Sequence, residues 1–344
     1  MGIAFKDLII GKEISISDLR DKILAVDSYN MLYQFLTTIR ARDGTLLMDS
    51  NGNITSHLVG LFSRTTKLMQ NKLKLVFVFD GKPPKLKEKE REKRHELKLE
   101  AKKEYEKAKA KEDIESMKKY AARTSVLTPD MVKEAKKLIA ALGLPIVDAP
   151  SEGEAQAAHL VKKEDAFATV SQDYDTLIHG SPKLIRNLSV VGKRKKTSKL
   201  AYETVKPEEV DLDENINNLG IDKNQLIVLA MLVGTDYNPG GIKGIGPKNA
   251  LKLVKKFGSD FDKLFVDVKW KDFFDMGWTE VYYLIKKMPV TDKYRLTWTE
   301  INKDRVIKLL VDEHNFSEER VNNSIEKLAV EKEKQSQKGL TDFF

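Results

Sequence analysis

The chain has 344 residues, 41% of them hydrophobic and 33% charged, so it can bury one large core or two modest ones, and we expect one elaborated domain. Its 60 Lys and Arg against 52 Asp and Glu give a formal net charge of +8, which favours a polyanionic partner but also occurs in ordinary basic proteins. Because cysteine is absent, disulfides, thiolate nucleophiles and cysteine-ligated metal sites are excluded, and any metal must be held mainly by oxygen.

The amino terminus is too short and too interrupted by charge for a signal peptide. No apolar run reaches the roughly 20 residues of a membrane span. We therefore expect an intracellular protein without a membrane partner.

Short apolar runs that end in an acidic residue predict buried strands at residues 23–27, 73–80, 145–148 and 166–173. Helical patterns such as those at 56–70 and 129–142 lie between them. This alternation predicts an α/β fold with a largely parallel central sheet flanked by helices. Open sheets of this kind place their sites at the carboxyl ends of the strands, where these aspartates fall.

Residues 85–111 carry twelve Lys or Arg against seven Glu and few large apolar side chains. We expect exposed helices that project from the sheet over about residues 82–125. The alternative is a solvated helical insertion stabilised by ion pairs at four-residue spacing.

Acidic residues form the strongest chemical pattern. The seven that stand out are Asp27, Asp80, Glu152, Glu154, Asp173, Asp175 and Asp236. Hard divalent cations such as Mg²⁺ prefer these oxygen ligands, and two such ions about 4 Å apart can activate water and stabilise the leaving oxygen of a phosphodiester.

Each acid also has a structural alternative. Asp27 and Asp80 could simply begin polar loops, and Asp236 lies in a glycine-flanked segment where aspartate often serves as a turn residue. Ser151 and Glu154 have the spacing of a capping box, so Glu154 could only close a helix start. The side chains of Glu152 and Glu154 would point in different directions within a regular helix. One of them could therefore bind a metal through water.

A glycine-rich segment at 241–250 lies between two apolar helical patterns, and the whole of about 222–256 predicts a helix-hairpin-helix motif. Gly244 and Gly246 allow a tight turn with exposed amides, and Pro247 suits the first position of a helix whose amino end favours phosphate. Such a motif holds duplex DNA by its backbone without reading sequence. The alternative is a plain helix–helix connection.

Eight short motifs follow one another along the chain. They are MGI at the start, YQF at 33–35, TSHLVGLFSRT at 55–65, VFDGKPPKLK at 78–87, DAPSEGEAQ at 148–156, GTDYN and GIKGIGPK at 234–248, and FSEER at 316–320. With these motifs the chain resembles the flap endonucleases, most closely those of archaea, almost from end to end. Departures are modest: many relatives have alanine at Gly153, some have TEDMD for SQDYD, and residues 190–202 are less familiar. We expect the basic run 193–196 to be a solvated hairpin tip, with an extra DNA contact as the alternative.

The resemblance implies two Mg²⁺ ions, with Mn²⁺ as an alternative. It places Asp27, Asp80, Glu152 and Glu154 around one ion and Asp173, Asp175 and Asp236 around the other. It implies that Lys87 and Arg94 reach the scissile phosphate from the helical arch and are catalytic. Further DNA contacts are implied for Gly2, Tyr33, Arg64, Gly244, Gly246, Lys248 and Arg320. The hairpin would also bind K⁺, and FSEER resembles part of the pocket for a one-nucleotide 3′ flap.

The last residues place Gln337, Leu340, Phe343 and Phe344 at spacings of three, three and one. One helical turn would present these apolar side chains to a groove on a partner. The pattern is similar to the family's clamp-binding peptide, which implies a sliding clamp of the proliferating cell nuclear antigen type. The alternative is a disordered end with fortuitous aromatic residues.

We therefore expect a single nuclease domain over 1–330, a flexible tail over 331–344, and a monomer that acts on branched DNA with a 5′ flap. The implied activity is 5′ flap endonuclease with 5′–3′ exonuclease activity in replication and repair. The implied location is cytoplasmic and chromosome-associated, or nuclear in a eukaryote. The rivals are a non-catalytic DNA-structure binder that recruits factors to the clamp, a general 5′ exonuclease and a bubble-opening repair nuclease.

Overall fold

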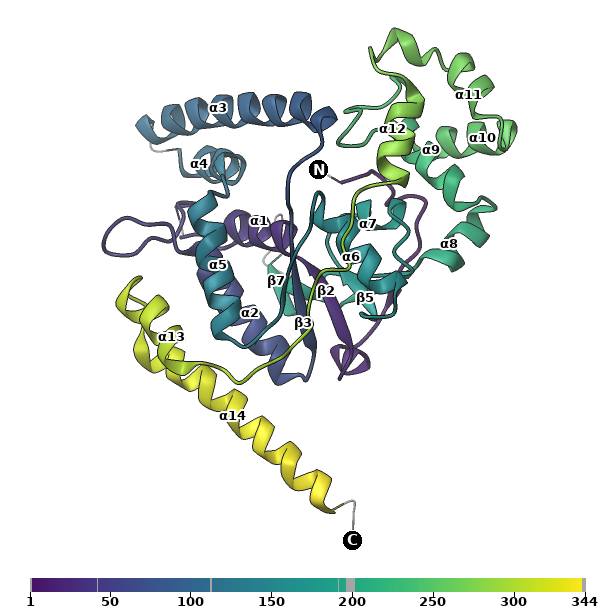
Figure 1. The fold of residues 1–344 in the computed structure, drawn as a ribbon. Helices are drawn as coiled ribbons and strands as arrows, with labels where there is room; N and C mark the ends of the chain where they lie inside the picture. The colour runs from purple at the N-terminus through teal and green to yellow at the C-terminus, as the bar shows by residue number, and fades with distance from the viewer. Residues whose placement is uncertain (1, 42, 112, 191, 196–201, 342–344) are drawn as a thin grey trace.

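A computed structural model describes residues 2–41, 43–111, 113–190, 192–195 and 202–341. Within these residues, seven strands form one sheet in the order β1-β9-β6-β5-β2-β3-β4 (Figure 1). The strands are β1 Lys12–Glu13, β2 Ile23–Asp27, β3 Lys74–Phe79, β4 Ile146–Asp148, β5 Ala168–Val170, β6 Lys183–Arg186 and β9 Glu208–Asp211. The predicted α/β class is confirmed.

The five strands from β6 to β4 are parallel to their neighbours, whereas β9 and β1 close one edge in antiparallel pairs. All four strands predicted from apolar runs lie in the parallel part, with β2 at its predicted bounds. In β2, Leu24 and Val26 pack into one apolar cluster and Ala25 packs into another. Both faces of the parallel sheet are therefore covered, which explains why its strands are continuously apolar.

Helices cover these two faces. One face packs against α1 Ser28–Thr38, α2 Ser56–Gln70 and α5 Pro129–Ala141, and the other against α6 Gly153–Lys162, with α7 Asp175–Ile178 beside it. Figure 1 shows the sheet between these two groups. Helix α2 has the predicted bounds, and α5 ends one residue before its predicted end.

The charged segment forms α3 Glu88–Ala110 and α4 Ile114–Ala121, which pack against each other. Figure 1 shows α3 at the upper left of the molecule above α4, joined to β3 by an extended connection. Few of its residues are buried, so the arrangement agrees with the prediction of exposed helices beyond the sheet. We call residues 82–125 the arch.

The second helical region contains α8 Leu212–Leu219, α9 Lys223–Val233, α10 Pro247–Phe257, α11 Phe261–Asp267 and α12 Trp278–Lys286. Helices α9 and α10 pack against each other and share one apolar cluster with α7 and the amino-terminal segment. A long segment without regular structure then returns across the body to α13 Lys303–Ile307 and α14 Glu318–Thr341.

Two segments have regular structure that the sequence analysis did not predict. In the tail expected to be flexible from residue 331, α14 continues to Thr341 because its Lys, Glu and Gln residues are strong helix formers; the flexibility itself stays a prediction. The backbone at Gln337 and Leu340 is thus helical, and Phe343 and Phe344 lie outside the described residues. The first three residues of the basic run, 193–195, lie in β7 Gly192–Lys195, which pairs antiparallel with β8 Tyr202–Val205; Lys196 lies outside the described residues.

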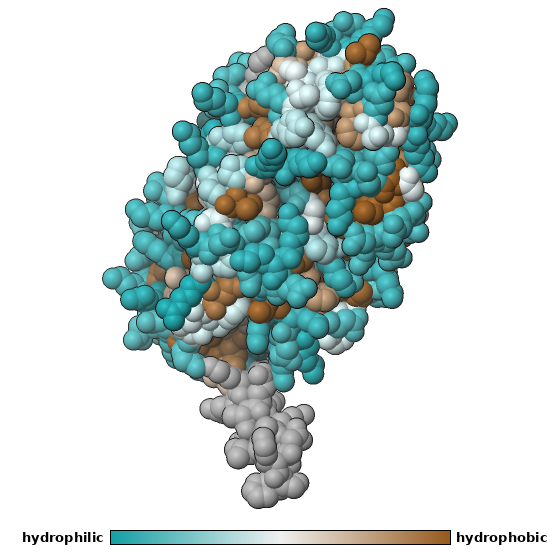
Figure 2. All heavy atoms as spheres, turned by 45° about the vertical axis from the view of Figure 1, so that its right-hand side comes forward, coloured by the Kyte–Doolittle hydropathy of each residue, from teal (hydrophilic) through white to brown (hydrophobic). Residues whose placement is uncertain are grey.

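The surface shown in Figure 2 is mostly hydrophilic, with apolar residues in small separate groups. In the described part of the chain, no helix is long and apolar enough to cross a membrane.

Candidate functional site: a cavity of seven carboxylates

All seven predicted acids line one cavity of about 390 Å³, which we call the carboxylate cavity. Its other lining residues are Tyr29, Asn30, Tyr33, Lys87, Arg94 and Lys98. The structure therefore brings together residues up to 209 positions apart in the sequence, from Asp27 to Asp236.

The parallel sheet explains this convergence. Asp27 ends β2 and Asp80 follows β3, and these two strands are paired in register from Ile23 to Asp27. Asp173 and Asp175 follow β5 on the other side of β2. The carboxyl ends of adjacent parallel strands meet at one edge, so the strand pattern alone places these four acids together.

Helix starts position the remaining acids. Glu152 is the N-cap residue of α6 and Glu154 lies in its first turn. The alternative capping box does not form, because the Ser151 hydroxyl donates to the Lys82 carbonyl at 3.1 Å and α6 has no side-chain cap. Asp236 follows α9 in the loop that leads into the hairpin.

Backbone and side-chain donors hold several carboxylates in place. The Gly153 amide donates to Asp80 Oδ1 at 2.6 Å, and a Cβ on Gly153 would lie only 2.7 Å from that oxygen. Glycine here lets Asp80 approach the amino end of α6, where the helix dipole favours negative charge. The Ile3 amide donates to Asp175 Oδ1 at 2.8 Å, which ties the chain's start to the cavity.

Asn30 is a site residue that the sequence analysis missed. Its Nδ2 donates to Asp173 Oδ2 at 2.9 Å, and its backbone amide donates to Asp27 Oδ1 at 3.0 Å. Its Oδ1 also accepts from the Gln172 amide at 3.1 Å. Asn30 thus connects the acids of two strands. A signal was present, because asparagine is a poor helix former placed one turn after Asp27 in an otherwise helical segment.

Lys87 and Arg94 from the base of the arch enter the same cavity. Lys87 Nζ lies 2.5 Å from Glu152 Oε2 and 3.1 Å from Asp236 Oδ2. Arg94 donates to Asp236 and, at 2.8 Å, to Glu90 Oε1. In the part of the chain that the structure describes, no group of three or more His, Cys, Asp or Glu residues is arranged ready to hold a metal ion. The two side-chain cations lie among the acids instead.

Burial and mutual repulsion raise the pKa values of four of the seven acids. Burial, followed by the charge of Asp80, raises the pKa of Asp27 to about 7. Burial raises the pKa of Asp175 to about 7, and burial with the Glu152 charge raises that of Asp80 to about 6. The pKa of Glu154 is also raised, mainly by burial and by Asp175. Positive charge in addition to that of Lys87 and Arg94 would lower these pKa values and stabilise the cluster.

These shifts predict how the stability of the metal-free protein depends on pH. Folding raises the pKa of these acids, so the folded state binds more protons than the unfolded chain between about pH 4 and 7, and stability must fall as pH rises through that window. In EDTA, we expect the unfolding temperature to fall as pH rises from about 4 to 7. Asp27→Asn, which mimics the protonated acid, should flatten this dependence in thermal unfolding. An equally steep dependence in the variant would contradict the explanation.

The other predicted contacts take different positions. Tyr33 lines the cavity with Lys98 Nζ 5.2 Å from its ring centre. Gly2 packs against Asp173, since a Cβ on Gly2 would lie 2.4 Å from Asp173 Cβ. Arg64 lies in α2 and is half-buried, but it does not line the cavity, so its role near the site stays a prediction.

The predicted helix-hairpin-helix consists of α9, the loop 234–246 and α10. Gly244 has φ +86°, and neither Gly244 nor Gly246 has a heavy atom within 4 Å of a built Cβ, so both lie open. Pro247 occupies the first turn of α10, and Lys248 is exposed beside it. This arrangement presents a helix amino end and a lysine to the solvent.

Arg320 lines a separate groove of about 890 Å³, formed by residues 47–63 and 314–327. We call it the C-terminal groove. Its second wall contains the FSEER motif at 316–320.

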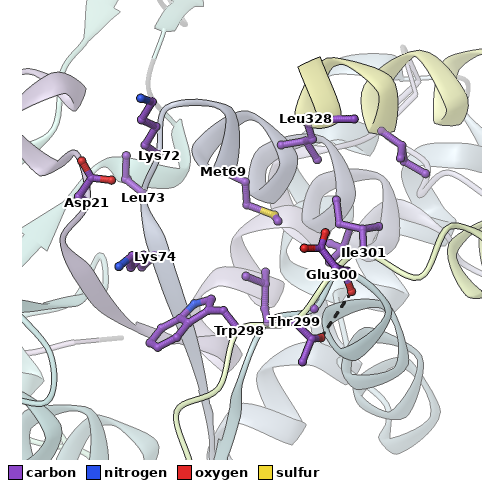
Figure 3. Close-up of a pocket in the computed structure, with 15 residues that line it drawn as sticks. Asp21, Met69, Lys72, Leu73, Lys74, Trp298, Thr299, Glu300, Ile301 and Leu328 are labelled. Atoms are coloured by element: carbon purple, nitrogen blue, oxygen red, sulfur yellow. Dashed lines mark hydrogen bonds between the residues drawn. The ribbon is translucent and has the colours of Figure 1, made fainter. Parts of the chain in front are cut away.

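A further cavity of about 360 Å³ lies against the beginning of β3, between α14 and the segment around Trp298 (Figure 3). Its lining is largely apolar, with Met69, Leu73 and Leu328 among its residues. None of the seven carboxylates reaches it, so it lacks the chemistry of the carboxylate cavity.

The chain is similar to known proteins over most of its length. The XPG N-terminal domain matches residues 2–101, and the XPG I-region matches residues 143–236. Flap endonuclease 1 of Pyrococcus horikoshii is 49% identical over 328 residues, covering 95% of this chain and 94% of that protein. Flap endonuclease 1 of Staphylothermus marinus is 48% identical and is covered from end to end.

Solved structures give the same result. Flap endonuclease-1 from Methanococcus jannaschii matches with a TM-score of 0.74 and 43% identity over 95% of this chain and 98% of that one. The catalytic core of Rad2 in complex with DNA substrate shares the fold, with a TM-score of 0.68 at 24% identity over 95% of this chain.

The two XPG matches and the acidic site define the class as a DNA nuclease that hydrolyses phosphodiester bonds. Within that class, the chain belongs to the flap endonuclease 1 family.

Proposed function

We propose that this nuclease removes 5′ flaps at their junction with duplex DNA in Okazaki fragment maturation and repair, and that it also has 5′–3′ exonuclease activity. The observation that carries the proposal is the meeting of seven carboxylates with Lys87 and Arg94 in one cavity below the arch. A binder that only recruits factors has no use for seven partly buried acids whose mutual repulsion destabilises the fold.

The donor set fits two Mg²⁺ ions, with Mn²⁺ as an alternative. It is made of carboxylate oxygens, and Asp27, Asp80, Glu154 and Asp175 have raised pKa values that a divalent cation would lower again. Asp27, Asp80, Glu152 and Glu154 would hold one ion, and Asp173, Asp175 and Asp236 the other. Bound there, the ions supply the Lewis acidity that activates water and stabilises the leaving oxygen.

The chain's own residues position the DNA in this proposal. A flap's free 5′ end enters below the arch, and Tyr33 stacks on a base near the scissile phosphate. Lys87 and Arg94 turn from the acids to the phosphate and stabilise the charge that develops there, a role suited to cations held in advance beside the reacting group. Gly2 and Arg64 make further contacts near the site.

Three other surfaces complete the proposed complex. The hairpin around Gly244 and Gly246 grips the duplex backbone, with K⁺ bound there, and the C-terminal groove with Arg320 receives a one-nucleotide 3′ flap. The peptide with Gln337, Leu340, Phe343 and Phe344 binds a sliding clamp. Helix α14 extends away from the body in Figure 1, which would keep this peptide clear of the DNA surfaces. The protein would act as a monomer on the chromosome of an archaeal cell.

Cutting of branched DNA tests the proposal. We expect purified protein with Mg²⁺ to cut an end-labelled double-flap DNA once, at the flap junction, leaving a 5′-phosphate and a 3′-hydroxyl, and to leave it intact in EDTA. Nicked and bubble substrates separate flap removal from general exonuclease or bubble-opening activity. Tight binding without cutting in Mg²⁺ would favour a recruiting scaffold.

Lys248→Ala tests the hairpin. We expect weaker binding to every DNA sequence and a slope of log affinity against log salt that is reduced by about one, because one phosphate contact is lost. Fluorescence anisotropy over a salt series measures both. Lys263→Ala, an exposed lysine paired with Asp260 outside the hairpin, serves as the matched control. An unchanged slope for Lys248→Ala would remove the hairpin from the DNA interface.

A further inference from the structure

Two chain segments 265 residues apart meet at the C-terminal groove. One wall is the turn at 47–55, and the other is the segment 314–327 at the start of α14. Direct bonds join them at two adjacent positions. His314 Nδ1 lies 3.0 Å from Asp49 Oδ2, and the Ser50 amide donates to Asn315 Oδ1 at 3.1 Å. We call this pair of contacts the clasp.

Asp49 is the anchor of the first wall. Its side chain is fully buried, and it accepts from the Asn51 amide at 2.9 Å, from the Asn53 amide at 2.8 Å and from Asn53 Nδ2 at 2.9 Å. Burial alone would raise the pKa of Asp49, but the bonds from Asn53 and His314 outweigh it and lower the pKa to about 2. Asp49 is therefore a permanent anion that fixes the turn.

His314 connects this anion to a second one. The residue is only 6% exposed, and its Nε2 lies 3.5 Å from Glu134 Oε1 on α5. Glu134 also faces His57 Nε2 of α2 at 3.2 Å. The two ring nitrogens of His314 therefore face two carboxylates on different elements, Asp49 on the turn and Glu134 on α5. The nuclease site does not use this group, since no member of it lines the carboxylate cavity.

Asn315 contributes the second contact through an unusual backbone. Its φ is +56°, in the left-handed region that asparagine tolerates better than most residues. This conformation lets consecutive side chains, His314 and Asn315, both reach the turn. Phe316 and Arg320 then follow on the wall of the groove.

We propose that His314 is a positioning residue for recognition of the DNA 3′ end. Through its contacts to Asp49 and Glu134, it holds the two walls of the C-terminal groove at the separation that admits a single 3′ nucleotide. This inference rests on the proposed function, because it needs a flap-cutting enzyme whose substrate carries that nucleotide. The inference adds to that function a role for His314, which sets how strongly the 3′ nucleotide improves DNA binding.

The test compares two substrates, a double flap with one 3′ nucleotide and a flap without it. We expect the 3′ nucleotide to lower KM for the wild type. His314→Gln, which lacks the ring that reaches Asp49 and Glu134 at once, should lose about 10-fold of the kcat/KM advantage of the double flap, mainly through KM, because a contact between the walls is removed. Asn315→Gly fits the same φ and removes only the bond to Ser50, so it should lose part of that advantage.

His159→Gln is the matched control, because His159, like His314, pairs with a carboxylate, here Asp292 at 2.8 Å, but lies away from the groove. It should keep the full advantage. If wild-type protein cuts no flap DNA, the proposed function fails. If the wild type cuts flap DNA but the 3′ nucleotide does not improve its kcat/KM, only the clasp proposal is overturned. The same holds if His314→Gln keeps the improvement in kcat/KM, or if it raises KM equally for both substrates. Should His314→Gln not fold, Asn315→Gly decides by the same criterion.

Discussion

Asp173→Ala is expected to abolish cutting of a double-flap DNA while leaving most of the DNA affinity in place. The carboxylate accepts from Asn30 Nδ2 at 2.9 Å and lines the carboxylate cavity, so its removal takes away an oxygen ligand. Loss of an outer partner of a metal ligand already costs about 10- to 100-fold, and we expect more than about 100-fold for the ligand itself. Affinity survives because phosphate contacts elsewhere supply it.

Single-turnover cutting in Mg²⁺ and fluorescence anisotropy in EDTA measure the two properties separately. Asp80→Ala should behave in the same way, because Asp80 follows the neighbouring strand β3. Asp148→Ala is the matched control: Asp148 also ends a strand of the parallel sheet, but its side chain is 68% exposed and pairs with Lys136. A near-normal cutting rate in Asp173→Ala or Asp80→Ala would refute the metal-ligand assignment.

The parallel part of the fold was predictable because it leaves a strong pattern. Each of its four recognised strands is buried on both faces, so it is a continuous apolar run, and the next polar residue marks the edge where the site lies. Asp27 and Asp80 were found in this way. By contrast, β1 and β9 were missed because they are short and polar, with Lys12 paired to Glu209 at the sheet edge. No apolar period marks such strands.

Side-chain pairs between residues far apart in the sequence could not be predicted from the sequence. Nothing in the local pattern connects His314 to Asp49, because the fold alone brings these distant residues together. The position of Lys87 is a similar case. The charge pattern predicts an exposed basic arch. Lys87 is nevertheless only 16% exposed and lies against Glu152, because its ion pair with the acids is more favourable than hydration of its ammonium group. For α14, helix propensity continues the helix to Thr341, although the tail lacks the apolar period from which a helix is usually predicted.

Lys87→Ala is expected to lower the cutting rate by about 10²- to 10³-fold, the usual effect of losing one group that stabilises charge in the transition state. Single-turnover cutting in saturating Mg²⁺ measures this loss. Lys107→Ala is the matched control, since Lys107 lies on α3, the helix that Lys87 immediately precedes, is 69% exposed and pairs with Glu104. Equal rates for Lys87→Ala and wild type would remove Lys87 from the reaction.

The same variant should bind Mg²⁺ more tightly in the absence of DNA. Burial acts to lower the pKa of Lys87, but Glu152 and Asp236 outweigh it and raise the pKa above its ordinary value, so the side chain stays charged. It lies 2.5 Å from Glu152 Oε2 and therefore competes with a metal ion for the same oxygens. Calorimetric titration of Mg²⁺ into wild type and Lys87→Ala tests this competition. Weaker Mg²⁺ binding by Lys87→Ala would mean that Lys87 organises the carboxylates rather than competing for them, whereas tighter binding with slower cutting would separate its two roles.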